Sequence, residues 1–165
     1  ADIGLHLPDF RSSERVFQLL CQVAGRAGRG VEPGQAIVQT YRPDHYAVVL
    51  GARQDYGGFY RNEIAFRRKQ NLPPFSRLIR LAFAHTSEAL AEREAARMGR
   101  ALRQQQQAWG MAEVDVMGPA PAYPLRVRGR YRWHVILRGP DPRLLLDKVD
   151  LEAGWIVDVD PVSVL

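Results

Sequence analysis

The apolar positions near the start of the chain follow helical spacing. Ser12 and Ser13 stand before Glu14, as is typical of a helix start, and four apolar residues follow on one side: Val16, Leu19, Leu20 and Val23. We expect this helix to stop at Gly25. The next residues should form a loop that is punctuated by Gly25, Gly28 and Gly30 and from which Arg26 and Arg29 project.

After this loop, the pattern of apolar residues predicts first a strand and then two helices, before a pair of prolines. Residues 35–41 contain consecutive β-branched residues and are predicted to form a strand. Residues 43–69 are predicted to form two helices, broken near the glycine pair Gly57 and Gly58. We place a domain boundary at the proline pair 73–74, because prolines end regular structure.

The rest of the chain follows the order strand, helix, strand, strand, helix, strand. The strands are expected at residues 77–84, 114–117, 130–137 and 155–159, and a short helix at 142–149. A long helix between the first two strands has one apolar face, at Ala91, Ala95, Met98 and Leu102, and a solvated end at the glutamines 104–107. This order predicts a mixed α/β (α+β) fold whose second part is a ferredoxin-like βαββαβ domain.

Composition bounds the class of protein. With 165 residues and 46% hydrophobic content, the chain is long enough for one ordinary domain or two small ones with a buried core. No apolar stretch has the roughly 20 residues of a membrane helix, and the start shows no export signal. The single cysteine, Cys21, can form neither an internal disulfide nor a zinc site by itself, so we expect a buried small side chain and a reducing, cytoplasmic setting.

The net charge of +5 favours an anionic partner, although many basic proteins bind no nucleic acid. The distribution is more informative than the total. Residues 118–139 contain no acidic residue and five arginines: Arg126, Arg128, Arg130, Arg132 and Arg138. The four histidines are too scattered for a metal site, and no combination of serine, histidine and acid suggests a nucleophile, so we predict no metal ligands.

The first candidate site is the segment from Gln22 to Arg29. Arg26 and Arg29 offer two planar guanidinium groups, which suit phosphate oxygens, and one of them could act as an arginine finger on a γ-phosphate held by another lobe. The alternative is a surface turn with solvated arginines. No glycine-rich phosphate loop ending in Lys-Ser or Lys-Thr occurs, so we expect the chain alone to be inactive as an ATPase.

The second candidate site is the basic segment 126–134. If these residues form one strand, one face carries the basic side chains, namely Arg126, Arg128, Arg130, Arg132 and His134. Like charges on one face repel each other, so this row requires acidic neighbours or an anionic partner. Neighbours could be supplied by Glu113, Asp115, Asp158 and Asp160. Otherwise the segment contacts a phosphate backbone or captures an acidic peptide tail.

Several segments carry a resemblance to a known family. Residues 22–29, Gln-Val-Ala-Gly-Arg-Ala-Gly-Arg, resemble motif VI of superfamily 2 helicases. Residues 1–11 resemble the stretch that precedes this motif in the primosomal protein N′ (PriA) family of replication-restart DNA helicases. Further segments are similar to the same family, at residues 73–77, 118–122, 128–133 and 158–161. The resemblance therefore covers nearly the whole chain.

The resemblance implies an ATP-dependent 3′-to-5′ DNA helicase of replication restart, primosome assembly and DNA repair. Residues 1–42 would be the C-terminal end of a RecA-like helicase lobe 2, residues 43–72 a helical connector, and residues 73–165 the family's C-terminal domain. Arg29 would be the arginine finger and Arg26 a second γ-phosphate contact, with Gln22 and Gly25 at the nucleotide. The family's Walker A loop, acidic box and zinc-binding cysteines are absent, so we expect a fragment of a longer protein.

The implied cofactors are ATP with magnesium, and zinc held by cysteines outside this chain. The implied partners are DNA forks and single strands, single-stranded DNA-binding protein and other primosome proteins, with no membrane, in the bacterial cytoplasm near the nucleoid. Arg130 would help to bind DNA or the acidic tail of single-stranded DNA-binding protein, and at His134 we expect glutamine in many relatives. The alternative is a protein-interaction module that docks primosome partners without direct DNA contact.

Overall fold

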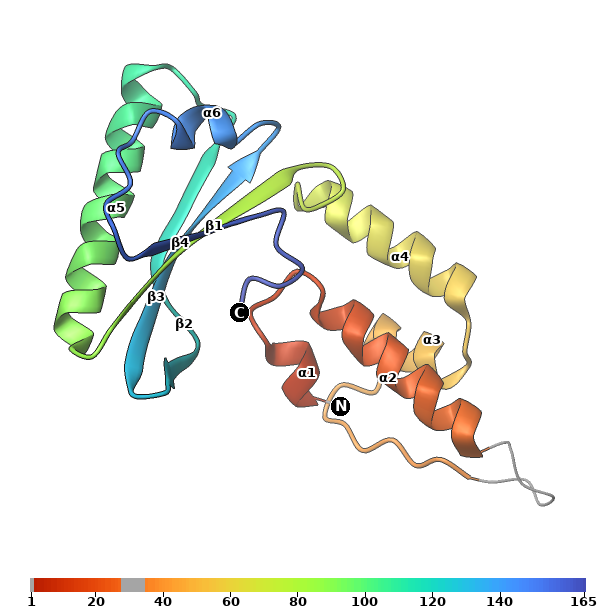
Figure 1. Ribbon diagram of the computed structural model, residues 1–165. Coiled ribbons are helices and arrows are strands. Elements are labelled where there is room, and N and C mark those ends of the chain that lie inside the picture. Colours follow the sequence, from red (N-terminus) through yellow and green to blue (C-terminus); the bar gives the residue numbers. More distant parts are fainter. Residues whose placement is uncertain (1, 28–34) are drawn as a thin grey trace. The chain divides into compact units, whose positions relative to one another are not determined.

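The computed structural model describes residues 2–27 and 35–165. The chain divides into two compact units, Ala1–Gln70 (unit 1) and Asn71–Leu165 (unit 2), which we describe separately (Figure 1). Within the described residues, no helix combines the length and the apolar character that a membrane crossing requires.

Unit 1 is helical, with α1 (Asp2–His6), α2 (Ser12–Ala27), α3 (Tyr46–Ala52) and α4 (Tyr56–Lys69). The predicted end of α2 at Gly25 is wrong, because the helix continues to Ala27. A glycine inside a helix costs only about 1 kcal/mol relative to alanine, and arginine and alanine at the next two positions favour the helix. Arg29 and the other loop glycines lie outside the described residues.

The connection between α3 and α4 also differs from the prediction. The break falls at residues 53–55, and Gly57 and Gly58 lie in the first turn of α4. The Asp55 carboxylate caps this turn by accepting a hydrogen bond from the Gly58 amide at 2.8 Å. A side chain at Gly58 would collide with that same carboxylate, so the glycine serves the cap rather than a break.

The predicted strand at residues 35–41 is wrong. This segment has no regular secondary structure and pairs with no described strand, and Ile37 and Tyr41 are 87% and 93% exposed. Its polar groups bind the start of the chain instead, since the Thr40 hydroxyl donates to the Asp2 carboxylate at 2.7 Å. A segment with strand propensity forms a strand only where it can pair with the edge of another strand. The described residues of unit 1 contain no such strand.

The core of unit 1 forms where α2 packs on α3 and α4. One cluster contains Val16, Leu20 and Val48, and a second contains Phe17, Ala47 and Phe59. The rings of Phe17 and Phe59 stack with their centroids 4.1 Å apart. The core therefore holds one face of α2, while Leu19 and Val23 on its other side stay 56% and 45% exposed.

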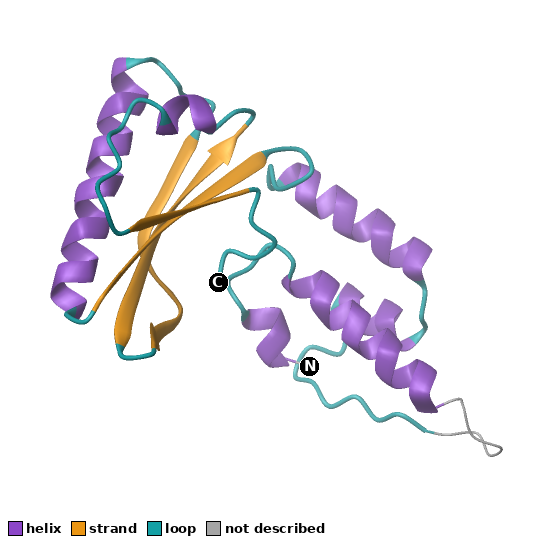
Figure 2. Ribbon diagram, viewed as in Figure 1, coloured by secondary structure: helices purple, strands orange, loops and turns teal. Residues whose placement is uncertain are grey.

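Unit 2 has the mixed α+β fold that the sequence predicted. Its elements are β1 (Arg77–His85), α5 (Glu88–Ala108), β2 (Asp115–Val127), β3 (Arg130–Gly139), α6 (Arg143–Leu146) and β4 (Trp155–Val159). The strands form one antiparallel sheet in the order β2-β3-β1-β4 (Figure 2). This order with this sequence of elements is the ferredoxin-like arrangement.

The two faces of the sheet differ. On one face, Ile79 and Leu81 of β1 and Val135 and Leu137 of β3 are fully buried against residues of α5 and α6, including Met98, Leu102 and Leu145. Because side chains alternate along a strand, the second face carries Arg80 and Ala82 of β1 and the β3 residues Arg130, Arg132, His134 and Arg138. The expected separation of apolar and basic faces on β3 is therefore observed.

Candidate functional site

The C-terminal turns of α2 carry part of the first candidate site. Gln22, Gly25 and Arg26 are all exposed. Gln22 and Arg26 are four residues apart, so their side chains lie on the same side of the helix. Arg26 forms no ion pair with a described carboxylate. The proposed finger, Arg29, lies outside the described residues.

The basic segment forms a hairpin rather than one strand. β2 runs to Val127, and a two-residue turn at Arg128 and Gly129, with φ of 49° and 78°, leads into β3. Positive φ at both central residues is the signature of a type I′ hairpin turn. The prediction that all five basic residues share one strand face is therefore wrong.

Arg126 lies on the opposite face of this hairpin from Arg130 and Arg132. It pairs across the strands with Tyr131, and its guanidinium lies 5.0 Å from the centre of that ring. Residues that face each other across an antiparallel pair point to the same side, so Arg126 shares the side of Tyr131. The sequence analysis ended the second strand at residue 117, whereas β2 continues through its prolines to Val127, which an edge strand tolerates.

The hairpin arginines are not neutralised by any described carboxylate. Arg126, Arg128 and Arg130 are exposed, Arg132 is half-buried, and none forms an ion pair with a described carboxylate. Arg130 donates a hydrogen bond to the Ala84 carbonyl at 2.8 Å, which orients its guanidinium. Two of the four predicted acidic neighbours pair elsewhere, since Asp115 binds Arg138 at 2.7 Å and Asp158 binds Arg80 at 3.3 Å.

His134 differs from its arginine neighbours. Burial lowers the pKa of its imidazole from the ordinary value of 6.5, and the positive charges of Arg80 and Arg132 lower this pKa further. The side chain is therefore neutral at pH 7. Its Nδ1 atom is buried and has no hydrogen-bond partner within the described residues. His134 thus offers a hydrogen-bonding nitrogen rather than a charge.

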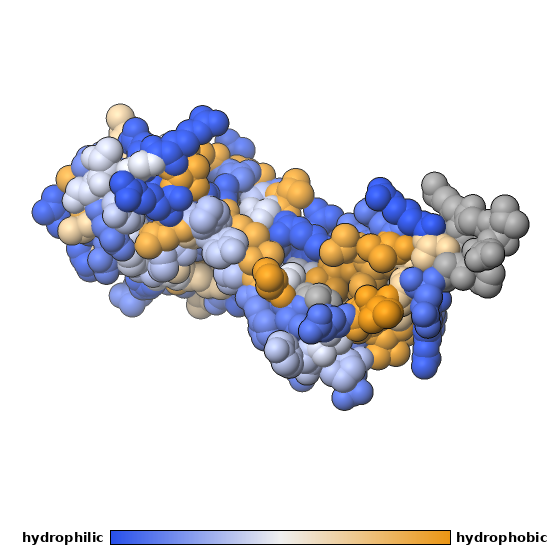
Figure 3. Space-filling model, turned by 90° about the horizontal axis from the view of Figure 1, so that it is seen from below, coloured by the Kyte–Doolittle hydropathy of each residue, from blue (hydrophilic) through white to orange (hydrophobic). Residues whose placement is uncertain are grey.

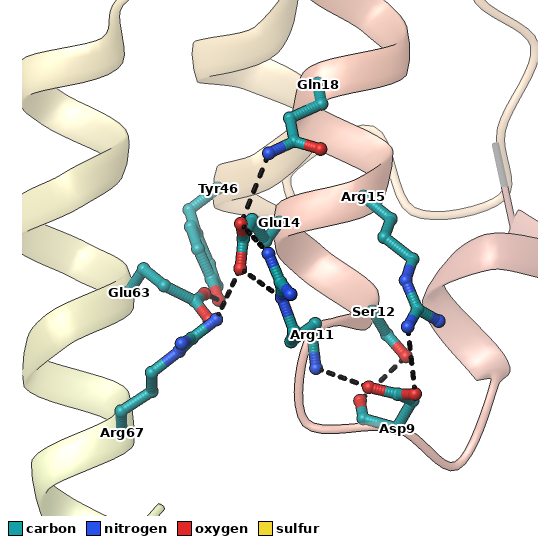
Figure 4. Close-up of polar contacts among 9 residues, drawn as sticks. All are labelled: Asp9, Arg11, Ser12, Glu14, Arg15, Gln18, Tyr46, Glu63 and Arg67. Carbon is teal, nitrogen blue, oxygen red and sulfur yellow. Dashed lines mark hydrogen bonds and ion pairs between the residues drawn. The ribbon is translucent and has the colours of Figure 1, made fainter. Parts of the chain in front are cut away.

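A buried polar network joins three helices of unit 1 (Figure 4). The Arg67 guanidinium binds Glu14 at 2.9 Å and Glu63 at 2.7 Å, and Arg11 binds Glu14 at 2.7 Å. The Tyr46 hydroxyl donates to Glu63 at 2.6 Å; burial, and then this hydrogen bond, raises the pKa of Tyr46 to about 12. Sequence reasoning missed this network, although the spacing of Glu63 and Arg67 by four residues signals an ion pair.

Unit 1 also has two hollows. One, of about 280 Å³, lies between α2 and α4 and is lined by Phe17, Tyr56, Phe59 and Tyr60. The other, of about 560 Å³, is lined by residues that include Ile3, Leu19 and Tyr41. Figure 3 shows hydrophobic surface gathered over unit 1 in this view. Within the described residues, no group of histidine, cysteine and acidic side chains could hold a metal ion.

Comparison with known proteins identifies the family. Residues 68–162 match the family model of the primosomal protein N C-terminal domain. The replication restart protein PriA of Treponema pallidum (strain Nichols) is 44% identical over the whole chain. The chain belongs to the PriA family. The PriA proteins of Bacillus subtilis (strain 168) and Synechocystis are 41% and 37% identical over 84% and 99% of the chain.

The match covers only part of each relative. The chain spans 26% of the Treponema PriA, 17% of the Bacillus PriA and 20% of the Synechocystis PriA. The resemblance to PriA that the sequence motifs indicated is confirmed, and the matched domain contains all of unit 2 up to Val162. The relatives are replication restart proteins by name, which places this chain among them at the level of the family.

Proposed function

We propose that the chain forms the C-terminal part of an ATP-dependent 3′-to-5′ DNA helicase of replication restart and primosome assembly, and that unit 2 binds DNA through the β2–β3 hairpin. The observation that carries the proposal is the exposure of Arg126, Arg128 and Arg130 without any described carboxylate partner. On the same sheet, Arg80 and Arg138 are each paired with an aspartate. The unpaired charge is thus concentrated at the hairpin.

The shape of the hairpin favours contact with a phosphate backbone. Guanidinium groups project from both of its faces, since Arg126 lies opposite Arg130 and Arg132, and Arg128 sits at the tip. A flexible single strand can bend around such a tip, and each phosphate that an arginine neutralises releases a condensed counterion. Base-specific contacts are not required, because phosphate contacts position a protein without reading sequence.

A second candidate function is supported by the surroundings of His134. This side chain and Arg132 are half-buried on the second face, next to Arg80, and the buried Nδ1 atom lacks a hydrogen-bond partner among the described residues. A carboxylate of the acidic tail of single-stranded DNA-binding protein could be recognised there by arginine and imidazole together. In this version the chain is an interaction module for primosome partners that makes no direct DNA contact.

One titration separates these candidates. The chain is titrated with a fluorescein-labelled oligothymidylate and, separately, with a labelled acidic peptide that ends in a free carboxylate. DNA binding through the hairpin predicts that Arg128→Ala with Arg130→Ala weakens oligonucleotide affinity at least tenfold. The matched control, Arg100→Ala, removes an exposed charge from α5 and should have little effect. Oligonucleotide binding that is equal in all variants would refute the hairpin, and binding of the peptide alone would favour the interaction module.

We also propose that α2 faces ATP bound on another lobe of the parent protein. Gln22 and Arg26 are exposed on one side of the helix, and Arg26 has no described acidic partner, so the residues fit a nucleotide phosphate. Arg26 and Arg29 would contact the γ-phosphate, and Gln22 and Gly25 would lie at the nucleotide. ATP hydrolysis, with magnesium, supplies the free energy for unwinding. Zinc, if the parent holds it, would be bound by cysteines outside this chain.

The nucleotide role is tested in the intact parent protein. Arg29→Ala should lower DNA-stimulated ATP hydrolysis by about 10³ or more, because an arginine finger stabilises charge that develops in the transition state. Arg53→Ala, which removes an exposed arginine between α3 and α4, is the control and should keep normal turnover. A parent in which both variants hydrolyse ATP at the normal rate would refute the finger role. On this proposal the protein works in the bacterial cytoplasm.

A further inference from the structure

The two edges of the unit 2 sheet are protected to different degrees. At one edge, β2 contains Pro119, Pro121 and Pro124 and shifts its register against β3 twice. Prolines and bulges are devices that prevent another chain from pairing with an edge strand. At the other edge, β4 has the sequence Trp-Ile-Val-Asp-Val, with no proline and no basic residue. The β4 edge therefore lacks the protection that β2 has.

The register shows which backbone groups of β4 point away from the sheet. The Asp160 amide donates to the Leu78 carbonyl at 2.8 Å, and β4 pairs antiparallel with β1. Hydrogen-bonded pairs alternate along an antiparallel ladder, so Asp158 and Ile156 also bond to β1. The N–H and C=O groups of Trp155, Val157 and Val159 then face outward. Among the described residues, these outward groups have no backbone partner.

The side chains around this edge are apolar and unusually exposed. Ile156 is 62% exposed, Val159 51% and Val157 38%, and Val162 just beyond the strand is 71% exposed. Strand residues of this type are normally half-buried against a neighbour on each side. The edge thus combines an unpaired backbone with apolar side chains, which is the arrangement that accepts an added strand.

The charge around β4 is opposite to that of the whole chain. Between Asp147 and Asp160 the sequence has a single lysine and five acidic residues: Asp147, Asp150, Glu152, Asp158 and Asp160. Asp158 pairs with Arg80, and Glu152 with Arg97. Asp150 and Asp160 are exposed and form no ion pair with a described residue. An added strand with basic side chains would complement these carboxylates.

We propose that the outer edge of β4 binds an extended segment of a partner protein, with alternating apolar and basic residues, as a fifth strand of the sheet. The apolar side chains would pack beside Val157 and Val159, and the basic ones would lie near Asp150 and Asp160. A second copy of the chain is disfavoured as the occupant. Each copy carries a net charge of +5, and two five-residue strands bury far less than the roughly 1,200 Å² of a stable interface.

Amide hydrogen exchange of the chain, measured residue by residue by NMR, tests the proposal. The probe is a capped heptapeptide of alternating lysine and valine. In the free chain, the Val157 and Val159 amides should exchange fast, and those of Ile156 and Asp158 slowly. Saturating peptide should slow exchange at Val157 and Val159 at least tenfold. Fast exchange that persists at these two amides with peptide bound or in excess would overturn the proposal.

Two variants and two peptides give the controls. Val157→Pro removes an outward N–H without touching the β1 ladder and should weaken peptide binding at least tenfold. Asp160→Asn keeps a residue suited to the positive φ of 49° and should weaken binding severalfold without any backbone change. The same peptide with glutamate for lysine, or with methylated outward amides, should not bind. Slow exchange of Val157 without peptide, together with a dimer in light scattering, would assign the edge to a second copy instead.

Discussion

The Arg67 guanidinium donates a hydrogen bond to the Glu14 carboxylate at 2.9 Å, which joins α4 to α2 between residues 53 positions apart. The same guanidinium binds Glu63 within α4. The side chain of Arg67 is only 12% exposed, and the two carboxylates are 21% and 8% exposed. The position of α2, and with it that of Gln22 and Arg26, therefore depends on a bridge that little water reaches.

Replacing Arg67 with methionine should destabilise unit 1 by about 3 kcal/mol, because two partly buried carboxylates lose their shared cation. Hydrogen exchange measured by mass spectrometry should show faster exchange in α2 and α4. All three tryptophans lie in unit 2, so tryptophan fluorescence should report unchanged unfolding of that unit. Arg61→Met, an exposed position on the same helix, is the control. Equal exchange in both variants would contradict the role of the bridge.

Tyr46→Phe should cost unit 1 about 1–3 kcal/mol, since the buried Glu63 loses a hydrogen-bond donor. The raised pKa of Tyr46 adds a pH dependence. The contribution of the protonated Tyr46 hydroxyl to the free energy of unfolding is fully present below the ordinary pKa of 10. This contribution is lost as the pH rises toward about 12. Ultraviolet titration should show one tyrosine ionising last, and this step should be absent from the variant. An unchanged titration would show that the last group is another tyrosine.

The sequence predicted helices and strands well where each of them packs on, or pairs with, another helix or strand of the same unit. The strands at 77–84 and 155–159 and the long helix of unit 2 agree with the structure, because β1 and α5 bury their apolar positions against one another and β4 pairs with β1. Residues 35–41 have the same strand propensity but no partner edge among the described residues, so the prediction was wrong. Propensity alone could not reveal this difference.

His134→Gln should make unit 2 less sensitive to acid. The folded-state pKa of His134 lies below 6.5, so the folded chain resists a proton that the unfolded chain accepts. The contribution of neutral His134 to the stability of unit 2 is therefore fully present above about pH 6.5. This contribution falls as the pH drops through the lowered pKa. Urea unfolding followed by tryptophan fluorescence should show a larger loss between about pH 7.5 and about pH 5.5 in the parent chain than in the variant. Parallel losses would contradict this account of His134.

Arg128→Asn should stabilise the hairpin while weakening DNA binding. Arg128 has a φ of 49°, which costs roughly 1 kcal/mol for most residues and less for asparagine, and Asn-Gly is a preferred type I′ turn. We expect a gain of about 0.5–1 kcal/mol in urea unfolding and a loss of oligonucleotide affinity. Stability and binding that fall together would show that Arg128 is retained for the fold.

The candidate sites were less predictable than the fold. The sequence analysis proposed the arginines of residues 126–132 as a site but assigned them to one strand, since the positive φ of Arg128 leaves no clear signal in the residue type. It also could not show that Asp115 and Asp158 pair with Arg138 and Arg80, which leaves the hairpin arginines without an ion-pair partner among the described carboxylates. The register between strands decides on which face each arginine lies and which aspartate it can reach. This register is set only in the folded sheet.

The salt dependence of single-strand binding tests the central claim most directly, namely that the hairpin arginines meet phosphates. If Arg126, Arg128, Arg130 and Arg132 neutralise about four phosphates, log affinity should fall with log salt at a slope near −3. The variant with Arg128→Ala and Arg130→Ala should give a slope of about −1.4, and Arg100→Ala should keep the parent slope. A hairpin variant with the same slope as the parent chain would contradict the claim.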